Sequence, residues 1–96
     1  MIRVQISARL QKRAAKLTPE LREAASATIA AVAESFGNPH QHGGLGLRKL
    51  GKRSFEVRVH RQWRGIFILD GEVLTAFDLM NHDEVRRWVR NQAKQP

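Results

Sequence analysis

The sequence predicts an α+β domain in which helices pack on one face of a twisted, mostly antiparallel sheet. Alternation of apolar and polar residues predicts an N-terminal strand and then a four-stranded sheet in the second half of the chain. Helical spacing predicts a helical hairpin between them and a helix at the C-terminus. The 96 residues are enough for one domain with one core and too few for two, so we expect a single domain over residues 1–96.

The first half of the chain favours one strand followed by two helices. Residues 2–6 alternate apolar and polar side chains, which is the pattern of a short, half-buried strand. Ser7 can cap a helix that runs to about Leu17. The Thr-Pro-Glu segment 18–20 begins a second helix, with an acid near the positive end of the helix dipole, and the Gly-Asn-Pro segment 37–39 ends it.

The second half favours strands and a final helix. A short strand bearing Arg48 and Lys49 comes first, followed by a regularly alternating strand at 55–60. Mostly apolar runs at 64–69 and 73–80 predict two central antiparallel strands, joined at the Asp-Gly dipeptide 70–71 that hairpin turns favour. Residues 83–94 predict a helix with acids first and bases last.

Positive charge is the most informative feature of the composition. The chain has 17 Lys and Arg against 9 Asp and Glu, a net charge of +8. Seven of the bases lie between Arg48 and Arg64 with one acid among them, and a second cluster comprises Arg86, Arg87, Arg90 and Lys94. Such density favours binding to a polyanion, of which nucleic acid is the leading expectation and anionic lipid and an acidic protein are the alternatives. The structural alternative is a charged surface that only contacts solvent.

Other features narrow the class of protein. The chain has no cysteine, which excludes disulfides and thiolate metal sites. Its N-terminus lacks the apolar stretch of a signal peptide and no apolar run reaches the length of a membrane span, so we expect a cytoplasmic protein that does not bind membranes. His40 and His42 could chelate a metal, but no further ligand is near in sequence, so we expect no metal.

One strand carries a candidate set of catalytic groups. Alternation places Glu56, Arg58 and His60 on the polar face of the strand at 55–60. Arg64 opens the next strand and His82 follows the last, so these side chains can converge on one site. A base, two arginines and a histidine suffice for cleavage of RNA through its own 2′-hydroxyl without metal.

Each of these residues also has a purely structural interpretation. Glu56 and Arg58 can form a surface ion pair, and His82 can help to cap the helix that follows it. His60 lies near a turn, where most histidines face solvent. Trp63 and Trp88 can stack on bases, but their apolar neighbours favour a place in the core. The Gly-Gly-Leu-Gly run 43–46 lacks the strand and helix that flank phosphate-binding loops.

Four segments carry a resemblance to a known family. They are Leu47-Arg48-Lys49-Leu50, Phe55-Glu56-Val57-Arg58-Val59, Gln62-Trp63-Arg64-Gly65-Ile66-Phe67 and Asn81-His82-Asp83-Glu84-Val85. In sequence and in order they resemble the RelE/ParE superfamily of bacterial toxin–antitoxin toxins, and nearly the whole chain is covered. The closing segment is most similar to relatives with a His-Asp-Glu-Ala-Tyr-x-Trp pattern. This chain departs from many relatives in having Asp83 in place of an arginine and Arg86 in place of a tyrosine.

The resemblance implies a microbial-ribonuclease-like fold and metal-independent cleavage of mRNA on the ribosome. By position, Arg64 would stabilise the transition state, His82 would act as general acid, Arg58 would contact the scissile phosphate, and Glu56 would be the base by analogy. The residues themselves leave His60 as an alternative base. Lys52 and Arg53 match positions of basic RNA contacts in other members. From the density of positive charge, we expect RNA-backbone or ribosome contacts also from Arg48, Lys49 and Arg61.

The leading expectation is therefore an mRNA interferase, a toxin that inhibits translation and is neutralised by an acidic or amphipathic antitoxin in a hetero-oligomer. Its alternatives are a ParE-like inhibitor of DNA gyrase, which binds without cleaving, and a catalytically inactive relative that only binds nucleic acid.

Overall fold

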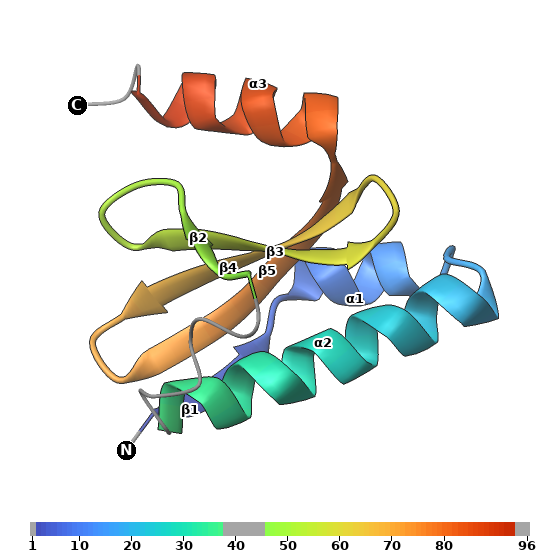
Figure 1. Ribbon diagram of the computed structural model, residues 1–96, viewed down its shortest axis with the longest axis horizontal. Helices are drawn as coiled ribbons and strands as arrows, with labels where there is room; N and C mark the ends of the chain where they lie inside the picture. Colours follow the sequence, from blue (N-terminus) through green and yellow to red (C-terminus); the bar gives the residue numbers. More distant parts are fainter. Residues whose placement is uncertain (1, 38–45, 94–96) are drawn as a thin grey trace.

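A single five-stranded sheet organises the computed structural model, which describes residues 2–37 and 46–93 (Figure 1). The strands lie in the order β1-β5-β4-β3-β2. In chain order the elements are β1 (Arg3–Ile6), α1 (Ala8–Ala14), α2 (Pro19–Gly37), β2 (Arg48–Lys49), β3 (Ser54–His60), β4 (Trp63–Asp70), β5 (Val73–Asn81) and α3 (His82–Ala93). The predicted α+β class is confirmed.

The prediction of a four-stranded sheet was wrong in its count, because the N-terminal strand joins the sheet as a fifth member. β1 pairs in parallel with β5, whereas every other neighbouring pair is antiparallel. The backbone N–H of Arg3 donates to the carbonyl of Glu72 at 2.6 Å, and that of Ser7 to Ala76 at 3.0 Å. Alternation within β1 marks it as a strand, but its partner is 70 residues away in the chain.

Local capping explains where the first two helices begin and end. The Ser7 hydroxyl accepts the N–H of Leu10 at 3.0 Å and the Thr18 hydroxyl accepts that of Leu21 at 3.3 Å, as N-caps do. α1 ends at Ala14, earlier than predicted. The guanidinium of Arg22 donates to the carbonyls of Ala14 at 3.2 Å and Leu17 at 3.1 Å, in the segment that joins α1 to α2.

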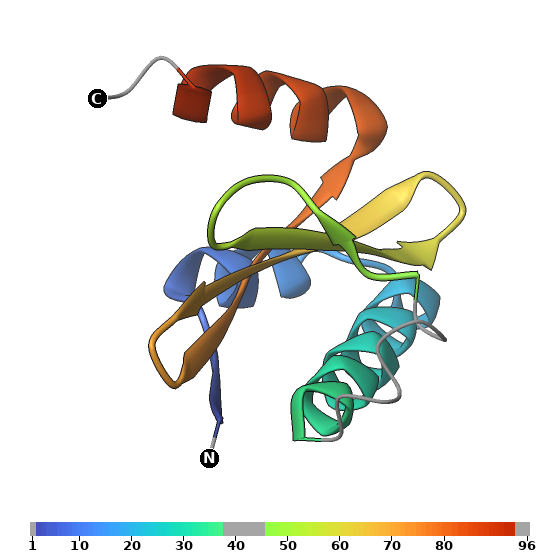
Figure 2. The same cartoon turned by 60° about the vertical axis from the view of Figure 1, so that its left-hand side comes forward.

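The helices cover both faces of the sheet, which corrects the prediction that they share one face. α1 and α2 lie on one side and α3 on the other (Figure 2). On the α1–α2 face the core includes Leu10, Leu21, Val32, Phe67 and Leu79, and on the α3 face it includes Ile66, Met80 and Val85. The sheet therefore separates two cores. The two N-terminal helices, predicted to form a hairpin, pack mainly on the sheet: α1 on β5, and α2 on β3.

A buried carboxylate ties α1 to the start of α3. Asp78 has no exposed side-chain surface, and it accepts the Nε–H groups of Arg9 at 2.8 Å and Arg13 at 2.9 Å and the backbone N–H of Leu79 at 2.8 Å. Arg13 also donates to Glu84 at 3.3 Å. Because a buried carboxylate is stable only when it is paired and hydrogen-bonded, this network fixes α1 and α3 against β5.

The β3–β4 and β4–β5 hairpins each turn through two residues, and the first turn residue has a positive φ in both. Asp70 pairs with Val73, so the β4–β5 turn consists of Gly71 and Glu72, one residue later than the predicted Asp-Gly turn. Gly71 has a φ of +62°, which glycine adopts without steric cost. In the β3–β4 turn the corresponding residue is Arg61, with a φ of 49°.

Among the described helices, none is both long and apolar enough to cross a membrane.

Candidate nucleic-acid interface

Two arginines face each other across the β3–β4 hairpin. Arg58 and Arg64 are direct cross-strand partners, so their side chains leave the same face of the sheet. Arg64 is also the partner of Met80, which packs with Val85, so this is the face that α3 covers. Neither arginine pairs with a carboxylate of the described residues, and like charges placed directly opposite destabilise a sheet. An anion between them would remove that repulsion.

Arg64 is oriented by the hairpin that carries it. Its Nη1–H group donates to the carbonyl of Arg61 at 3.3 Å, and the residue is half-buried, whereas Arg58 is exposed. The guanidinium of Arg64 is thus partly held in place before any ligand binds, which lowers the entropy lost on binding a phosphate.

Glu56 shares this face but is already paired. It is the cross-strand partner of Arg48, and the two side chains form an ion pair with Nε to Oε1 at 3.3 Å. Glu56 is buried, with a side-chain exposure of 11%, while the Arg48 side chain is 74% exposed. The surface pair with Arg58 that the sequence allowed is not formed. Glu56 lies two residues from Arg58, about 6.6 Å along the strand.

His82 is exposed and lies at the same end of the sheet as the arginine pair. It follows Met80, the cross-strand partner of Arg64, by two residues and is the first residue of α3. Asn81 caps the helix: its Oδ1 accepts the N–H of Glu84 at 2.8 Å, and its own N–H donates to Glu84 at 3.1 Å. The capping role considered for His82 therefore belongs to Asn81.

His60 does not lie with Glu56 and Arg58, which corrects the prediction from alternation. The register of β3 and β4 shifts between Arg58 and His60, and an irregularity of this kind turns the following side chain to the other face. His60 pairs with Trp63 and its Nε2 lies 3.5 Å from Oε1 of Glu20 in α2. His60 is therefore separated from the arginine pair by the sheet.

The other predicted RNA contacts are dispersed. Lys49 is the partner of Phe55, which packs on Phe36 of α2, so Lys49 leaves the face opposite Arg48. Lys52 and Arg53 precede β3, with Arg53 about 16 Å from Arg58 along the chain. Arg53 also pairs with Asp70 at 3.2 Å. Arg61 occupies the tip of the β3–β4 hairpin.

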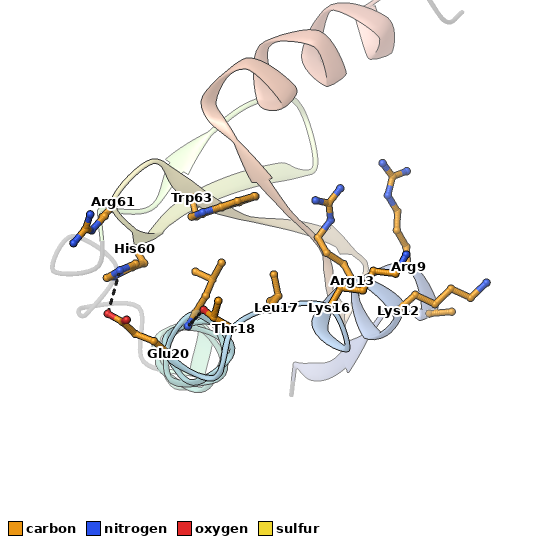
Figure 3. Close-up of a pocket in the computed structure, with 12 residues that line it drawn as sticks. Arg9, Lys12, Arg13, Lys16, Leu17, Thr18, Glu20, His60, Arg61 and Trp63 are labelled. Carbon is orange, nitrogen blue, oxygen red and sulfur yellow. Dashed lines mark hydrogen bonds and ion pairs between the residues drawn. The ribbon is translucent and has the colours of Figure 1, made fainter.

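A second basic feature lies on the α1–α2 face, where α1, the start of α2 and the β3–β4 hairpin enclose an open hollow of about 1180 Å³ (Figure 3). We call it the hairpin hollow; its lining includes Lys12, Lys16, Leu17, His60, Arg61 and Trp63. This hollow was not predicted from the sequence. Trp63 packs against the core, as expected, and also lines the hollow. The sequence feature that could have indicated this basic surface is the segment from Arg9 to Lys16, which contains four bases and no acid.

The histidine pair His40 and His42 and most of the glycine run, residues 43–45, lie outside the described residues. Within the described ranges, no three side chains of the metal-binding types gather at one point.

Comparison with the known protein families, with curated proteins and with solved structures finds no match to this chain. The function is therefore inferred from the side chains and their geometry.

Proposed function

We propose that this protein is a toxin of a bacterial toxin–antitoxin system, of the RelE kind, that cleaves mRNA on the ribosome and so inhibits translation. The observation that carries the proposal is the cross-strand pair of Arg58 and Arg64, two cations placed opposite each other without a carboxylate partner in the described chain. Such a pair favours a bound phosphate, because paired guanidinium groups bind phosphate oxygens by charge-assisted hydrogen bonds.

The proposed reaction uses two arginines, a histidine and a carboxylate on the α3 face. The RNA 2′-hydroxyl attacks the adjacent phosphorus, and the bond from phosphorus to the 5′-oxygen breaks, which leaves a 2′,3′-cyclic phosphate and a 5′-hydroxyl end. Arg58 and Arg64 stabilise the charge that develops on the phosphorane oxygens. His82 donates the proton that the leaving 5′-oxygen requires.

Glu56 is the proposed acceptor of the 2′-hydroxyl proton. In the free protein its carboxylate is paired with Arg48, whose side chain is mostly exposed. A substrate phosphate competes for Arg48 as an alternative anionic partner, and release of this arginine leaves the carboxylate free to take the proton. Arg48 then serves as an RNA contact, the role expected from its sequence position.

A neutralising protein partner is part of the proposal. An acidic or amphipathic antitoxin would cover Arg48, Arg58 and Arg64. The edge strand β1 also leaves Val4 39% and Ile6 46% exposed, and exposed apolar residues on an unpaired strand edge favour association with another chain.

Expression of an Arg64→Ala variant tests the cleavage. We expect wild-type induction to arrest growth and to produce site-localised RNA ends on translated messages, mapped by primer extension. Because loss of one transition-state donor costs about 10²–10³ in rate, Arg64→Ala and His82→Ala should abolish both effects. Arg3→Ala, which removes an exposed cation from β1 at the other end of the sheet, is the control and should stay toxic. Full toxicity of both test variants would refute the site, and altered DNA supercoiling without RNA ends would favour the gyrase-binding alternative.

The ion pair of Glu56 with Arg48 favours a second candidate, a relative that binds RNA without cleaving it. This candidate predicts RNA binding with a steep salt dependence and no new RNA ends on translating ribosomes. Purified protein assayed for both properties separates it from the nuclease.

A further inference from the structure

The hairpin hollow is lined by several cations, by Trp63 and by one acid, Glu20, whose carboxylate lies 3.5 Å from Nε2 of His60. We propose that it binds an unpaired nucleotide of single-stranded RNA, separately from the arginine pair on the α3 face. The choice of RNA rests on the function proposed above. At about 1180 Å³ the hollow exceeds the range of about 300–1,000 Å³ typical of small-ligand pockets, and one side is open, so a nucleotide fits within a continuing strand.

The walls of the hollow suit a planar base. Figure 3 shows Trp63 on the hairpin side, with Leu17 and Thr18 of the helical side across from it. Trp63 is half-buried: it packs against the core of the α1–α2 face and also lines the hollow. Stacking of a base on an aromatic ring needs no particular sequence and is a principal source of affinity for single strands.

The cations at the hollow fall into two groups. Arg9 and Arg13 line it, but both are already paired with the buried Asp78. Lys12, Lys16 and Arg61 have no carboxylate partner within the described residues. In Figure 3 Arg61 lies at one end, and the lysines lie toward the other. Phosphates on both sides of a stacked base would meet these charges.

The backbone of Arg61 supports a binding role for its side chain. Arg61 holds a φ of 49° at the turn position where Gly71 of the neighbouring hairpin holds +62°. Residues other than glycine occupy this region at a cost in stability, and such strained residues cluster at functional sites. A cation that faces an anionic ligand at the mouth of the hollow explains why an arginine stands where glycine would be less strained.

An acidic protein segment is the competing occupant, since it would also satisfy the three cations. The aromatic wall favours RNA, because carboxylate side chains gain nothing from stacking on indole whereas every nucleobase does. Quenching of Trp63 fluorescence therefore distinguishes the two occupants.

Titration of a Trp88→Phe variant, in which Trp63 is the remaining tryptophan, with a short oligouridylate tests the proposal. We expect saturable quenching. Replacing Lys12 and Lys16 together with Ala should weaken binding about tenfold and reduce the slope of log K against log salt by about 1.4, at about 0.7 per phosphate contact. An Arg3→Ala variant removes an exposed cation beside the β4–β5 turn, at the opposite end of the sheet from the hollow, and should change neither quantity to this extent.

An Arg61→Gly variant separates binding from folding. It should weaken the oligouridylate severalfold while raising the melting temperature, because glycine relieves the backbone strain. Replacing Arg58 and Arg64 with Ala should abolish RNA cleavage and leave quenching in place, so the proposal can fail or succeed independently of the nuclease.

Three results would overturn the proposal. The first is a failure of the oligouridylate to quench the fluorescence, the second is quenching that the Lys12 and Lys16 replacements leave unchanged, and the third is equal quenching by an oligoglutamate. If the Trp88→Phe variant does not fold, fluorescence anisotropy of labelled oligouridylate with otherwise unchanged protein makes the same comparison among the lysine and arginine variants.

Discussion

Asp78 shows how one residue can determine the position of several others. Its carboxylate is fully buried and accepts hydrogen bonds from Arg9, Arg13 and the backbone of Leu79. Arg9 also lies over the ring of Phe77, 5.2 Å from its centroid, a distance at which cation and ring attract. Two of the four bases between Arg9 and Lys16 are thereby committed to structure, which leaves Lys12 and Lys16 for ligands.

Replacement of Asp78 with Asn should destabilise the protein by about 2–3 kcal/mol. The change removes the anion that Arg9 and Arg13 share. Arg13 keeps its ion pair with Glu84, and the two arginine side chains are 56% and 30% exposed, so this pair and water offset part of the loss. Urea unfolding measures the effect, with the m-value as a check that the unfolded state is unchanged. Arg9→Ala should cost clearly less, because Arg13 keeps the carboxylate paired; an equal or larger cost would contradict this account.

At the scale of elements, the start of α3 determines where His82 stands. Asn81 and Glu84 cap one another's backbone N–H groups, so the chain turns from β5 into α3 without an intervening loop. His82 is thereby held next to the end of the strand that pairs with Arg64.

Replacement of Asn81 with Ala should cost about 1 kcal/mol of stability, the usual value of an N-cap. Because it loosens the first turn of α3, it should also reduce RNA cleavage more than it reduces oligouridylate quenching. Thermal unfolding and the two functional assays measure these effects. Asn91→Ala, an exposed site near the other end of α3, is the control; equal losses of cleavage in the two variants would refute the positioning role.

At the scale of the whole molecule, the sheet divides the positive charge. Arg58 and Arg64 leave the α3 face, whereas Lys12 and Lys16 belong to the hairpin hollow on the α1–α2 face. Arg61 lies at the tip of the β3–β4 hairpin, where the two faces meet. RNA could therefore contact both faces around one end of the sheet.

The two sets should contribute additively to the salt dependence of RNA binding. With RNA long enough to reach both faces, removal of either pair of cations should lower the slope of log K against log salt by about 1.4, and removal of both pairs by about 2.8. Binding isotherms at several salt concentrations provide the slopes. A combined loss no larger than that of one pair would show that only one face binds RNA.

Much of the fold was predictable because it depends on interactions within a few residues. Ser7 and Thr18 cap the predicted helices, and the α+β order of elements is confirmed. Alternation correctly placed Arg58 on the face opposite Val57. The same alternation failed at His60, because a register shift depends on how β3 pairs with β4 and leaves no mark in β3 alone.

The sequence by itself determined the element types, most of the apolar faces and the density of positive charge, all of which follow from local periodicity, capping and composition. It did not determine the burial of β1, whose four residues are all exposed. Tertiary structure alone decided that β1 lies beside β5, that α3 covers the opposite face, that Glu56 pairs with Arg48, and that Trp63 lines a hollow. These outcomes depend on contacts between distant segments, such as Arg9 with Asp78 across 69 positions, whose geometry is set by packing of the whole sheet.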